Sequence, residues 1–533
     1  MFTGVRPGSF VSAFSVQGRL KLGRRRRPTT MSHITAEELL DARATELRAL
    51  RAHLGCCARC TLRFAGIRDP SVYMQAEAAL DEATLPAAGA PPPADDAAAV
   101  CPICLGCLAH CMRHDAIANF AESVRATDFA MTSFSISISI PVNLLVRERA
   151  AWLHLGRVRA DTDGLDASPL TRRPNFESIT ELKETIRWVI AEPLARALGV
   201  PVDPNAKLLV YVLFSSPCTA GEHHPLINAL LPPESAHLKR KRTEQGQPQE
   251  VDSIRAVQRA LTVGSRGDEL LRASAALCPP RAPAAPCMMG VGIEREPIAL
   301  TGRYRKYSRS LPQSPWLVEG QLKCAGSVAE FISQHAVPLY AASDAKFHSA
   351  GREDVDVRML GRGRPFLLEL LAPKRPEHTA AEIELLQQRI NACGLIEISG
   401  LREGSLHAVS TLMKEGEEAH RKEYRAVLVL SRSVTDADLE RLNGTSELVV
   451  DQLTPMRVMH RRTLMVRQRT IHALSATRLG GRFLQLDLVT QAGTYVKEFC
   501  HGDFGRTVPN VGSLLGCSTD IMQLDVLDLQ DEH

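Results

Sequence analysis

The sequence contains no run of 18 or more apolar residues, so it has no predicted membrane span. Its 14 cysteines in 533 residues are far fewer than a disulfide-stapled secreted scaffold carries. It also lacks the glycine patterns of a Walker loop or a Rossmann fold, and it has no visible internal repeat. We therefore expect an intracellular, soluble protein without a membrane partner. Its length predicts two to four domains.

Acidic residues are absent from the first 36 positions, whereas seven positive charges occur there, four of them at 24–27. This composition is typical of a mitochondrial presequence, and the four-arginine run alone is typical of a nuclear signal. An unstructured leader, bypassed by a start at Met31, explains it equally well. We expect residues 1–33 to be a basic leader. The expected compartments are the nucleus and the cytoplasm, with the mitochondrion as a further address.

Changes in composition divide the rest of the chain. Residues 34–126 are helical by period and enclose a low-complexity Ala/Pro loop at 85–99. Four prolines within 278–287 mark a domain boundary, and beyond it β-prone runs alternate with helical stretches. We predict an N-terminal helical region, then an accessory domain at 127–290, then a mixed α/β or α+β domain at 291–533.

Two CxxC pairs occur in the helical region, Cys57 with Cys60 and Cys101 with Cys104. Four thiolates make a closed tetrahedral zinc shell that leaves no position open for chemistry. Buried reduced cysteines are the alternative. A redox pair is less favoured, because that motif follows a strand and opens a helix. We expect one structural Zn²⁺ per chain.

Residues 452–486, here called the acid-free tract, contain seven arginines and not one Asp or Glu. The planar guanidinium binds two phosphate oxygens at once, so the tract, including Arg461 and Arg462, predicts contact with a nucleic-acid backbone. A solvated basic face is the alternative. The segment RYRKYSR at 303–309 adds aromatic rings to cations, a combination that contacts phosphates and stacks on unpaired bases.

Strand-like alternation in this segment would place its members on two faces. One face would carry Arg303, Arg305, Tyr307 and Arg309, and the other Tyr304 and Lys306.

The segment GREDVDVRMLGRGRPF (351–366) places Asp354 and Asp356 between Arg352 and Arg358. Neighbouring guanidinium groups would hold a carboxylate ionised, as a nucleophile or an anionic base requires. A metal or phosphotransferase site and a structural salt-bridge network are the alternatives.

In GTYVKEFCHGDFGRT (493–507), Tyr495 and Lys497 lie two residues apart, on one face of an extended segment. An aromatic ring and a cation directed together suit a base and an anion.

Together GREDVDVR, RYRKYSR and GTYVKEF with HGDFGRT and NVGSLL resemble the tRNA pseudouridine synthases that modify uridines 54 and 55 of the T-arm. This is the tenth pseudouridine synthase family, and the resemblance, over residues 46–533, is to its animal members. It implies an α+β protein with the pseudouridine synthase catalytic fold, a mixed sheet with an RNA-binding cleft. A zinc-containing, THUMP-like accessory domain would precede it.

The resemblance also implies roles for single residues. Asp354 would be the one catalytic aspartate, and Lys497 would be the ionic partner of Asp354. Tyr495 would stack on the base, and Leu514 would be the apolar residue under it. Arg352 would be among the substrate contacts. The implied reaction isomerises uridine to pseudouridine without a catalytic cofactor. A monomer acting on the tRNA T-arm is expected.

Two other functions stay open. Animal members of the family are implied to associate with primary microRNA and its processing complex, so a non-catalytic RNA-binding adaptor is the first. A metal-dependent phosphohydrolase that uses Asp354 and Asp356 is the second.

Overall fold

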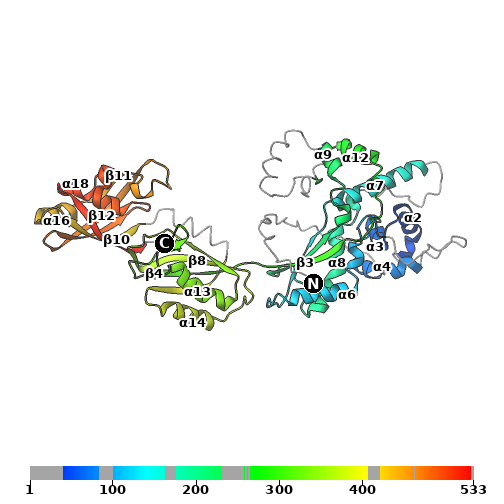
Figure 1. Ribbon diagram of the computed structural model, residues 1–533, viewed down its shortest axis with the longest axis horizontal. Helices are drawn as coiled ribbons and strands as arrows, with labels where there is room; N and C mark the ends of the chain where they lie inside the picture. Colours follow the sequence, from blue (N-terminus) through cyan, green and yellow to red (C-terminus); the bar gives the residue numbers. More distant parts are fainter. Residues whose placement is uncertain are drawn as a thin grey trace, which may run out of the picture.

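The computed structural model describes residues 40–82, 100–162, 176–230, 257–258, 261, 264–405, 421–460 and 462–529. The described parts form two bodies joined by a short connection (Figure 1). The leader, the Ala/Pro loop at 85–99 and Arg461 lie outside the described residues. Within the described ranges, no helix has both the length and the apolarity to cross a membrane.

The first body is mainly helical around a three-stranded sheet in the order β1-β2-β3. Alternating Ser and Ile form β1, and the apolar run at 208–214 forms β2, as the period of a half-buried strand and a buried apolar run indicate. β1 pairs parallel with β2, and β2 pairs antiparallel with β3. The strands are β1 (Ser135–Ser139), β2 (Leu208–Ser215) and β3 (Met288–Arg295). The helices are α2 (Ala44–Leu54), α3 (Ala58–Phe64), α4 (Pro70–Glu82), α5 (Cys107–His110), α6 (His114–Arg125), α7 (Asn143–Thr162), α8 (Leu182–Leu198), α9 (His224–Leu230) and α12 (Gly264–Ala273).

The N-terminal helices and this sheet share one hydrophobic core. Leu47 and Tyr73 from the helices are buried in the same cluster as Phe134 and Val210. The predicted regions 34–126 and 127–290 therefore fold as one body. Because β3 completes its sheet, this body continues to Arg295, five residues beyond the predicted boundary at 290.

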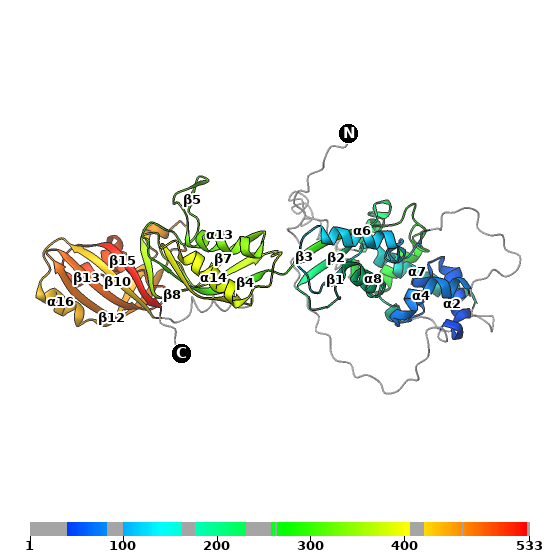
Figure 2. The same ribbon diagram turned by 90° about the horizontal axis from the view of Figure 1, so that it is seen from below.

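The second body is built on a ten-stranded sheet in the order β14-β11-β12-β13-β10-β15-β8-β4-β9, with β7 also paired to β8. Its strands are β4 (Ile298–Lys306), β7 (Asp344–Ser349), β8 (Val357–Leu371), β9 (Ile396–Gly404), β10 (Lys422–Leu430), β11 (Ser446–Leu453), β12 (Val466–Gly480), β13 (Phe483–Thr490), β14 (Thr507–Val508) and β15 (Thr519–Leu529). The helices are α13 (Val328–Tyr340), α14 (Ala380–Asn391), α16 (Asp436–Asn443), α17 (Val496–His501) and α18 (Val511–Leu515). A small hairpin of β5 (Leu317–Val318) and β6 (Gln321–Leu322) stands out from this body (Figure 2).

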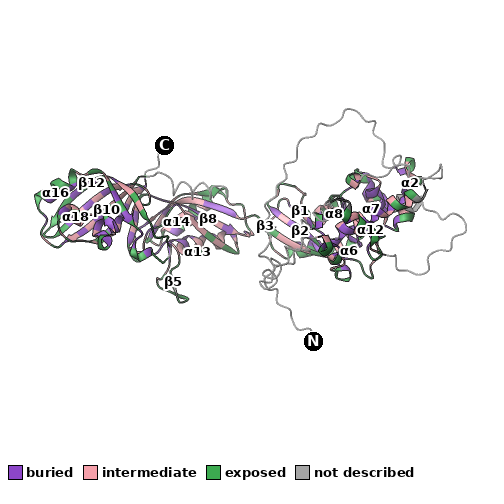
Figure 3. Cartoon of the chain, turned by 90° about the horizontal axis from the view of Figure 1, so that it is seen from above, coloured by how far each residue is buried: buried purple, intermediate pink, exposed green. Residues whose placement is uncertain are grey.

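This mixed α+β body has one core, and its buried residues follow the strands (Figure 3). Among the described strand pairs of the large sheet, β15–β8 alone is parallel, and it joins two antiparallel halves. The pairing is short, from Val357 opposite Leu524 to Met359 opposite Val526. Because β8 begins at Val357, the segment that carries Asp354 and Asp356 lies directly at this junction.

Candidate active site

The loop between β7 and β8 carries the two aspartates, and buried groups fix its shape. Gly351 has φ +94°, and a Cβ there would lie 2.6 Å from Nη1 of Arg364. That same Nη1 donates to the carbonyl of Ala350 at 2.7 Å. The glycine thus allows both the left-handed backbone and the close guanidinium.

Two cations face the carboxylate of Asp354. Nη1 of Arg457 lies 3.1 Å from its Oδ2, and Nζ of Lys497 lies 3.3 Å from the same oxygen. The two cations hold the Asp354 carboxylate in place. Because the Asp354 side chain is 39% exposed, it is still open to a ligand. Lys497 also donates to both carboxylate oxygens of Asp356 at 2.8 Å. One ammonium therefore bridges the two aspartates.

These charges perturb one another. Partial burial opposes the charged form of Asp356, but the Lys497 ammonium holds the pKa of that carboxyl below its ordinary value. Burial also opposes the charge of Arg457, while Glu498 and Asp354 together raise the pKa of Arg457 above its ordinary value. Nε of Arg457 donates to Oε1 of the buried Glu498 at 2.7 Å, which orients the guanidinium toward the loop.

A buried network supports the loop from below. Glu353, next to Asp354, accepts hydrogen bonds from the Tyr304 hydroxyl and from Nε of Arg364, all at 2.9 Å. Nζ of Lys306 donates to the Asp354 carbonyl at 3.1 Å. Both Tyr304 and Lys306 are fully buried, so the predicted alternation of the RYRKYSR segment is confirmed for its inward face.

The predicted arginine flanks do not hold Asp354. Arg358 forms a bidentate pair with Asp525 at 2.9 and 2.5 Å, because β15 runs beside β8 at this point. Arg352 is exposed. The cations that contact Asp354 come instead from Arg457 and Lys497, more than 100 residues away along the chain.

The segment around Tyr495 is also different from the prediction. It is not extended, because α17 begins directly after Tyr495, which is its N-cap residue, and Lys497 lies in the first turn. Val496, Phe499 and Cys500 are buried at helical spacing, and this explains the helix. The buried Gln452 amide accepts from the Tyr495 backbone N–H at 2.8 Å and donates to its carbonyl at 2.9 Å.

The other predicted substrate contacts are spread over the second body. Arg309 binds Asp525 at 2.6 Å and donates to the carbonyl of Asp356 at 3.0 Å, so it helps to build the site. Arg303 donates to the carbonyls of residues 362 and 363, and the half-exposed Tyr307 hydroxyl donates to Glu397. The remaining members are Arg462, which is exposed, and Leu514, which is half-buried against the core.

Sequence reasoning gave no site role to Arg457, Glu498, Glu353 or Asp525. Arg457 belongs to the acid-free tract, but nothing in the tract distinguishes an arginine that faces Asp354 from one that faces solvent. Glu353 lies inside the motif that carries Asp354, but the sequence of the motif does not indicate that Glu353 is buried. Asp525 is an ordinary alternating position of a strand, so it gave no signal.

The four cysteines of the two CxxC pairs come together as predicted. Their Sγ atoms all lie within 4.8 Å of one another. The backbone N–H of Cys57 donates to Sγ of Cys101 at 3.4 Å, and Nη1 of Arg63 approaches Sγ of Cys60 at 3.8 Å. Donors directed at sulfur favour thiolates, so this group fits a four-coordinate metal ion.

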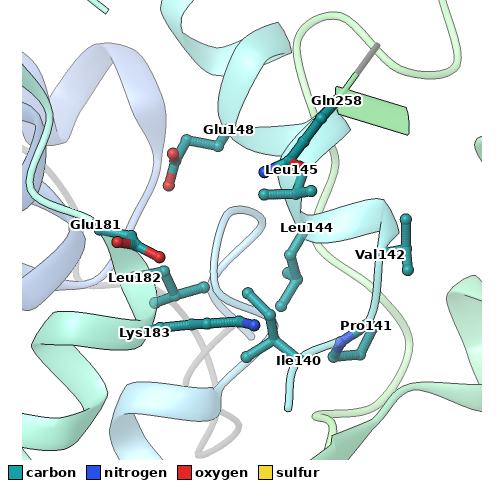
Figure 4. Close-up of a pocket in the computed structure, with 10 residues that line it drawn as sticks. All are labelled: Ile140, Pro141, Val142, Leu144, Leu145, Glu148, Glu181, Leu182, Lys183 and Gln258. Atoms are coloured by element: carbon teal, nitrogen blue, oxygen red, sulfur yellow. The ribbon is translucent and has the colours of Figure 1, made fainter. Parts of the chain in front are cut away.

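A pocket in the first body lies elsewhere (Figure 4). Leu144 and Leu182 form part of its wall, and the side chains of Glu148, Glu181 and Lys183 surround it. No candidate catalytic residue lines it. The candidate catalytic side chains around Asp354 lie in the second body.

The fold and the site define an α+β protein that presents one carboxylate between two cations. Residues 299–530 match the family model described as "Pus10, C-terminal", and residues 101–291 match "Eukaryotic Pus10, N-terminal". The chain is 40% identical over 429 residues to the human protein named tRNA pseudouridine synthase Pus10. This alignment covers 80% of this chain and 77% of the human protein. The chain therefore belongs to the Pus10 family.

Other relatives carry the same name. The Xenopus laevis protein is 38% identical over 80% of this chain and 79% of its own length. The Thermofilum pendens protein is 39% identical over 44% of this chain and 53% of its own. Among solved structures, a Cbf5-Nop10-Gar1 complex aligns with 43% of this chain and 48% of its own, at 16% identity and a TM-score of 0.26.

Proposed function

We propose that this chain isomerises uridine to pseudouridine in the T-arm of tRNA, at position 54, 55 or both, with Asp354 as the reacting carboxylate. The observation that carries the proposal is the setting of Asp354. Its side chain is 39% exposed, and its Oδ2 lies 3.1 Å from Arg457 and 3.3 Å from Lys497. Two cations at these distances orient the carboxylate before substrate binds.

The reaction needs only groups that this chain carries. The target uridine must leave the base stack, because its C5 and its C1′ are otherwise inaccessible. The Asp354 carboxylate then either attacks C1′ or removes a proton from C2′, and the bond from C1′ to N1 breaks. The detached uracil rotates, and C5 bonds to C1′. On the first route the bond between the Asp354 oxygen and C1′ breaks as the new bond forms, and on the second route Asp354 returns the proton to C2′. N1 gains a proton and C5 loses one, so the carboxylate is regenerated and no oxidant or co-substrate is needed.

The neighbouring residues have distinct roles in this proposal. Tyr495 stacks on the uracil, and its backbone is fixed by the two hydrogen bonds to Gln452. Leu514 provides an apolar surface under the base. Lys497 and Arg457 hold the carboxylate by their ionic contacts and direct it toward the sugar.

A metal-dependent phosphohydrolase is less well supported. Such a site needs its two carboxylates to converge on a cation. Here the Lys497 ammonium lies 3.3 Å from Asp354 and 2.8 Å from Asp356, where a metal ion would have to bind.

For the first body we propose a structural role with RNA-binding capacity. Zn²⁺ would be held by Cys57, Cys60, Cys101 and Cys104, and it would tie the N-terminal helices together without taking part in chemistry. The three-stranded sheet with its helices would be the THUMP-like module that grips the tRNA.

Mapping pseudouridine in tRNA transcripts after incubation with the pure protein tests this function. The expected product appears in the T-arm, and it disappears when the target uridine is replaced by cytidine. Modification outside the T-arm would contradict the proposed target. Tight binding without any product would instead support a non-catalytic RNA-binding adaptor, such as one for primary microRNA.

A further inference from the structure

The turn that follows α17 has an unusual backbone. Four consecutive residues, from Gly502 to Gly505, have positive φ, with values of 79°, 46°, 56° and 85°. Glycine adopts this region freely and Asp tolerates it, but in a bulky residue the Cβ crowds the following carbonyl. Phe504 is therefore the residue that this turn accommodates least well.

Hydrogen bonds on both sides of Phe504 hold the turn. Oδ2 of the buried Asp503 accepts from the Met456 backbone N–H at 3.2 Å, and the Asp503 N–H donates to Nδ1 of His501 at 3.0 Å. Nη2 of Arg506 donates to the Thr454 carbonyl at 2.7 Å. The turn therefore cannot relax to relieve Phe504.

The Phe504 side chain is 93% exposed, so the fold does not use its ring for packing. A glycine or asparagine would fit this backbone with less strain. Strained backbone of this kind persists where the surrounding structure enforces it, and it concentrates at functional sites.

The turn is close to the candidate active site. Asp503 binds the backbone of Met456, whose neighbour Arg457 contacts Asp354. From Lys497 the chain runs four residues to the end of α17 and three more to Phe504, a Cα separation of at most about 17 Å at 1.5 Å per helical residue and 3.8 Å per extended one. Stacked nucleotides of one strand are about 3.4 Å apart, so this length corresponds to about five of them.

Other exposed apolar side chains lie in the acid-free tract. Met456, whose backbone Asp503 binds, is 53% exposed, and Met465 is 50% exposed. Exposed apolar side chains in a stretch of sequence that carries only positive charges suit a flat, uncharged base attached to phosphates.

We propose that Phe504 stacks on an unpaired nucleobase of the substrate RNA, within about five nucleotides of the target uridine. This inference rests on the proposed function, because it places the base relative to Asp354. It adds a substrate contact outside the pair of Tyr495 and Lys497.

Three variants test the contact. Phe504→Gly removes the ring and relieves the backbone, so its Tm should equal or exceed that of the wild type. Its affinity for a T-arm RNA should fall about 5- to 150-fold, the range for loss of one stacked base. Phe504→Trp should keep the affinity within about threefold. Trp316→Ala is the matched control, because Trp316 is also an exposed aromatic residue but lies directly before the β5–β6 hairpin, outside the acid-free tract and the turn after α17.

A fluorescence readout locates the base. With 2-aminopurine placed singly in about five nucleotides on either side of the target, one position should be quenched by the wild type and by Phe504→Trp, but not by Phe504→Gly. Unchanged affinity and kcat/KM in Phe504→Gly would overturn the inference, even if the wild type makes pseudouridine. If the wild type makes none while Phe504→Gly loses affinity and quenching, the stacking contact stands and the proposed function fails.

Discussion

Replacing Lys306 with Met tests how the Asp354 loop is held. The buried Lys306 ammonium donates to the carbonyls of Leu311, Asp354 and Val355 at 2.8, 3.1 and 2.8 Å. A buried carbonyl without a donor costs about 1–3 kcal/mol, so three cost about 3–9 kcal/mol. Methionine also removes a buried charge. Burial lowers the pKa of Lys306 from 10.5 to about 8, despite the nearby carboxylates, and this shift corresponds to about 3 kcal/mol. The expected net loss of folding stability is therefore about 3 kcal/mol.

The effect on turnover should be larger than the effect on binding. If the loop carrying Asp354 moves by about 1 Å, kcat should fall about 100-fold, while affinity for tRNA should stay within about threefold. Single-turnover pseudouridine formation and a filter-binding titration measure the two quantities. Lys346→Met, which changes an exposed lysine of β7, is the control. A kcat within twofold of the wild type would refute the supporting role of Lys306.

The same lysine gives a pH signature. Between about pH 8 and 10.5 the unfolded chain keeps a proton that folded Lys306 has released, so unfolding takes up a proton in this window. The free energy of unfolding should therefore rise with pH there, by at most about 1.4 kcal/mol per pH unit. Below pH 8 this contribution should be constant. Urea unfolding of the wild type and of Lys306→Met should differ by this slope, and identical slopes would contradict the assignment.

Three further predictions address other parts of the molecule. Asp356→Asn should lower kcat about tenfold or less, since the neighbouring aspartate keeps a cation of its own; complete loss of product would contradict a single essential carboxylate. Cys60→Ser should reduce bound zinc from about one per chain to less than a tenth, by elemental analysis, and full retention would show that the thiols are ordinary core residues. Arg462→Ala should weaken all RNAs alike and lower the salt dependence of affinity by about one unit of slope, whereas Tyr307→Ala should weaken binding with little change in slope. The reverse pattern would contradict the phosphate and base assignments.

Local sequence patterns predict individual strands and helices of the fold. Alternating Ser and Ile gave β1, and the periodicity of residues 379–393 gave α14, whose first turn is held by a capping box between Thr379 and Glu382. The residues that form each of these signals lie close together in the sequence. The order of strands in the large sheet could not be predicted in this way, because the short parallel pairing of β15 with β8 joins residues about 167 positions apart.

The candidate site shows the same limit. The motif at 351–358 singled out the segment that carries Asp354, which lies on the loop before β8, but the ionic partners of Asp354 could not be read from the adjacent sequence. Arg358 forms an ion pair with Asp525, and the guanidinium group that contacts Asp354 is that of Arg457. The four cysteines could be predicted because two short, identical motifs leave one simple way to form a tetrahedral shell.

The central claim is that Asp354 performs the chemistry while other groups bind the RNA. Asp354→Asn preserves the shape of the side chain and removes its negative charge. Single-turnover assays on a T-arm transcript, paired with a binding titration of the same protein, test this claim most directly. The account predicts no detectable pseudouridine and a Kd within about threefold of the wild type. Product formation at a rate within tenfold of the wild type would contradict it.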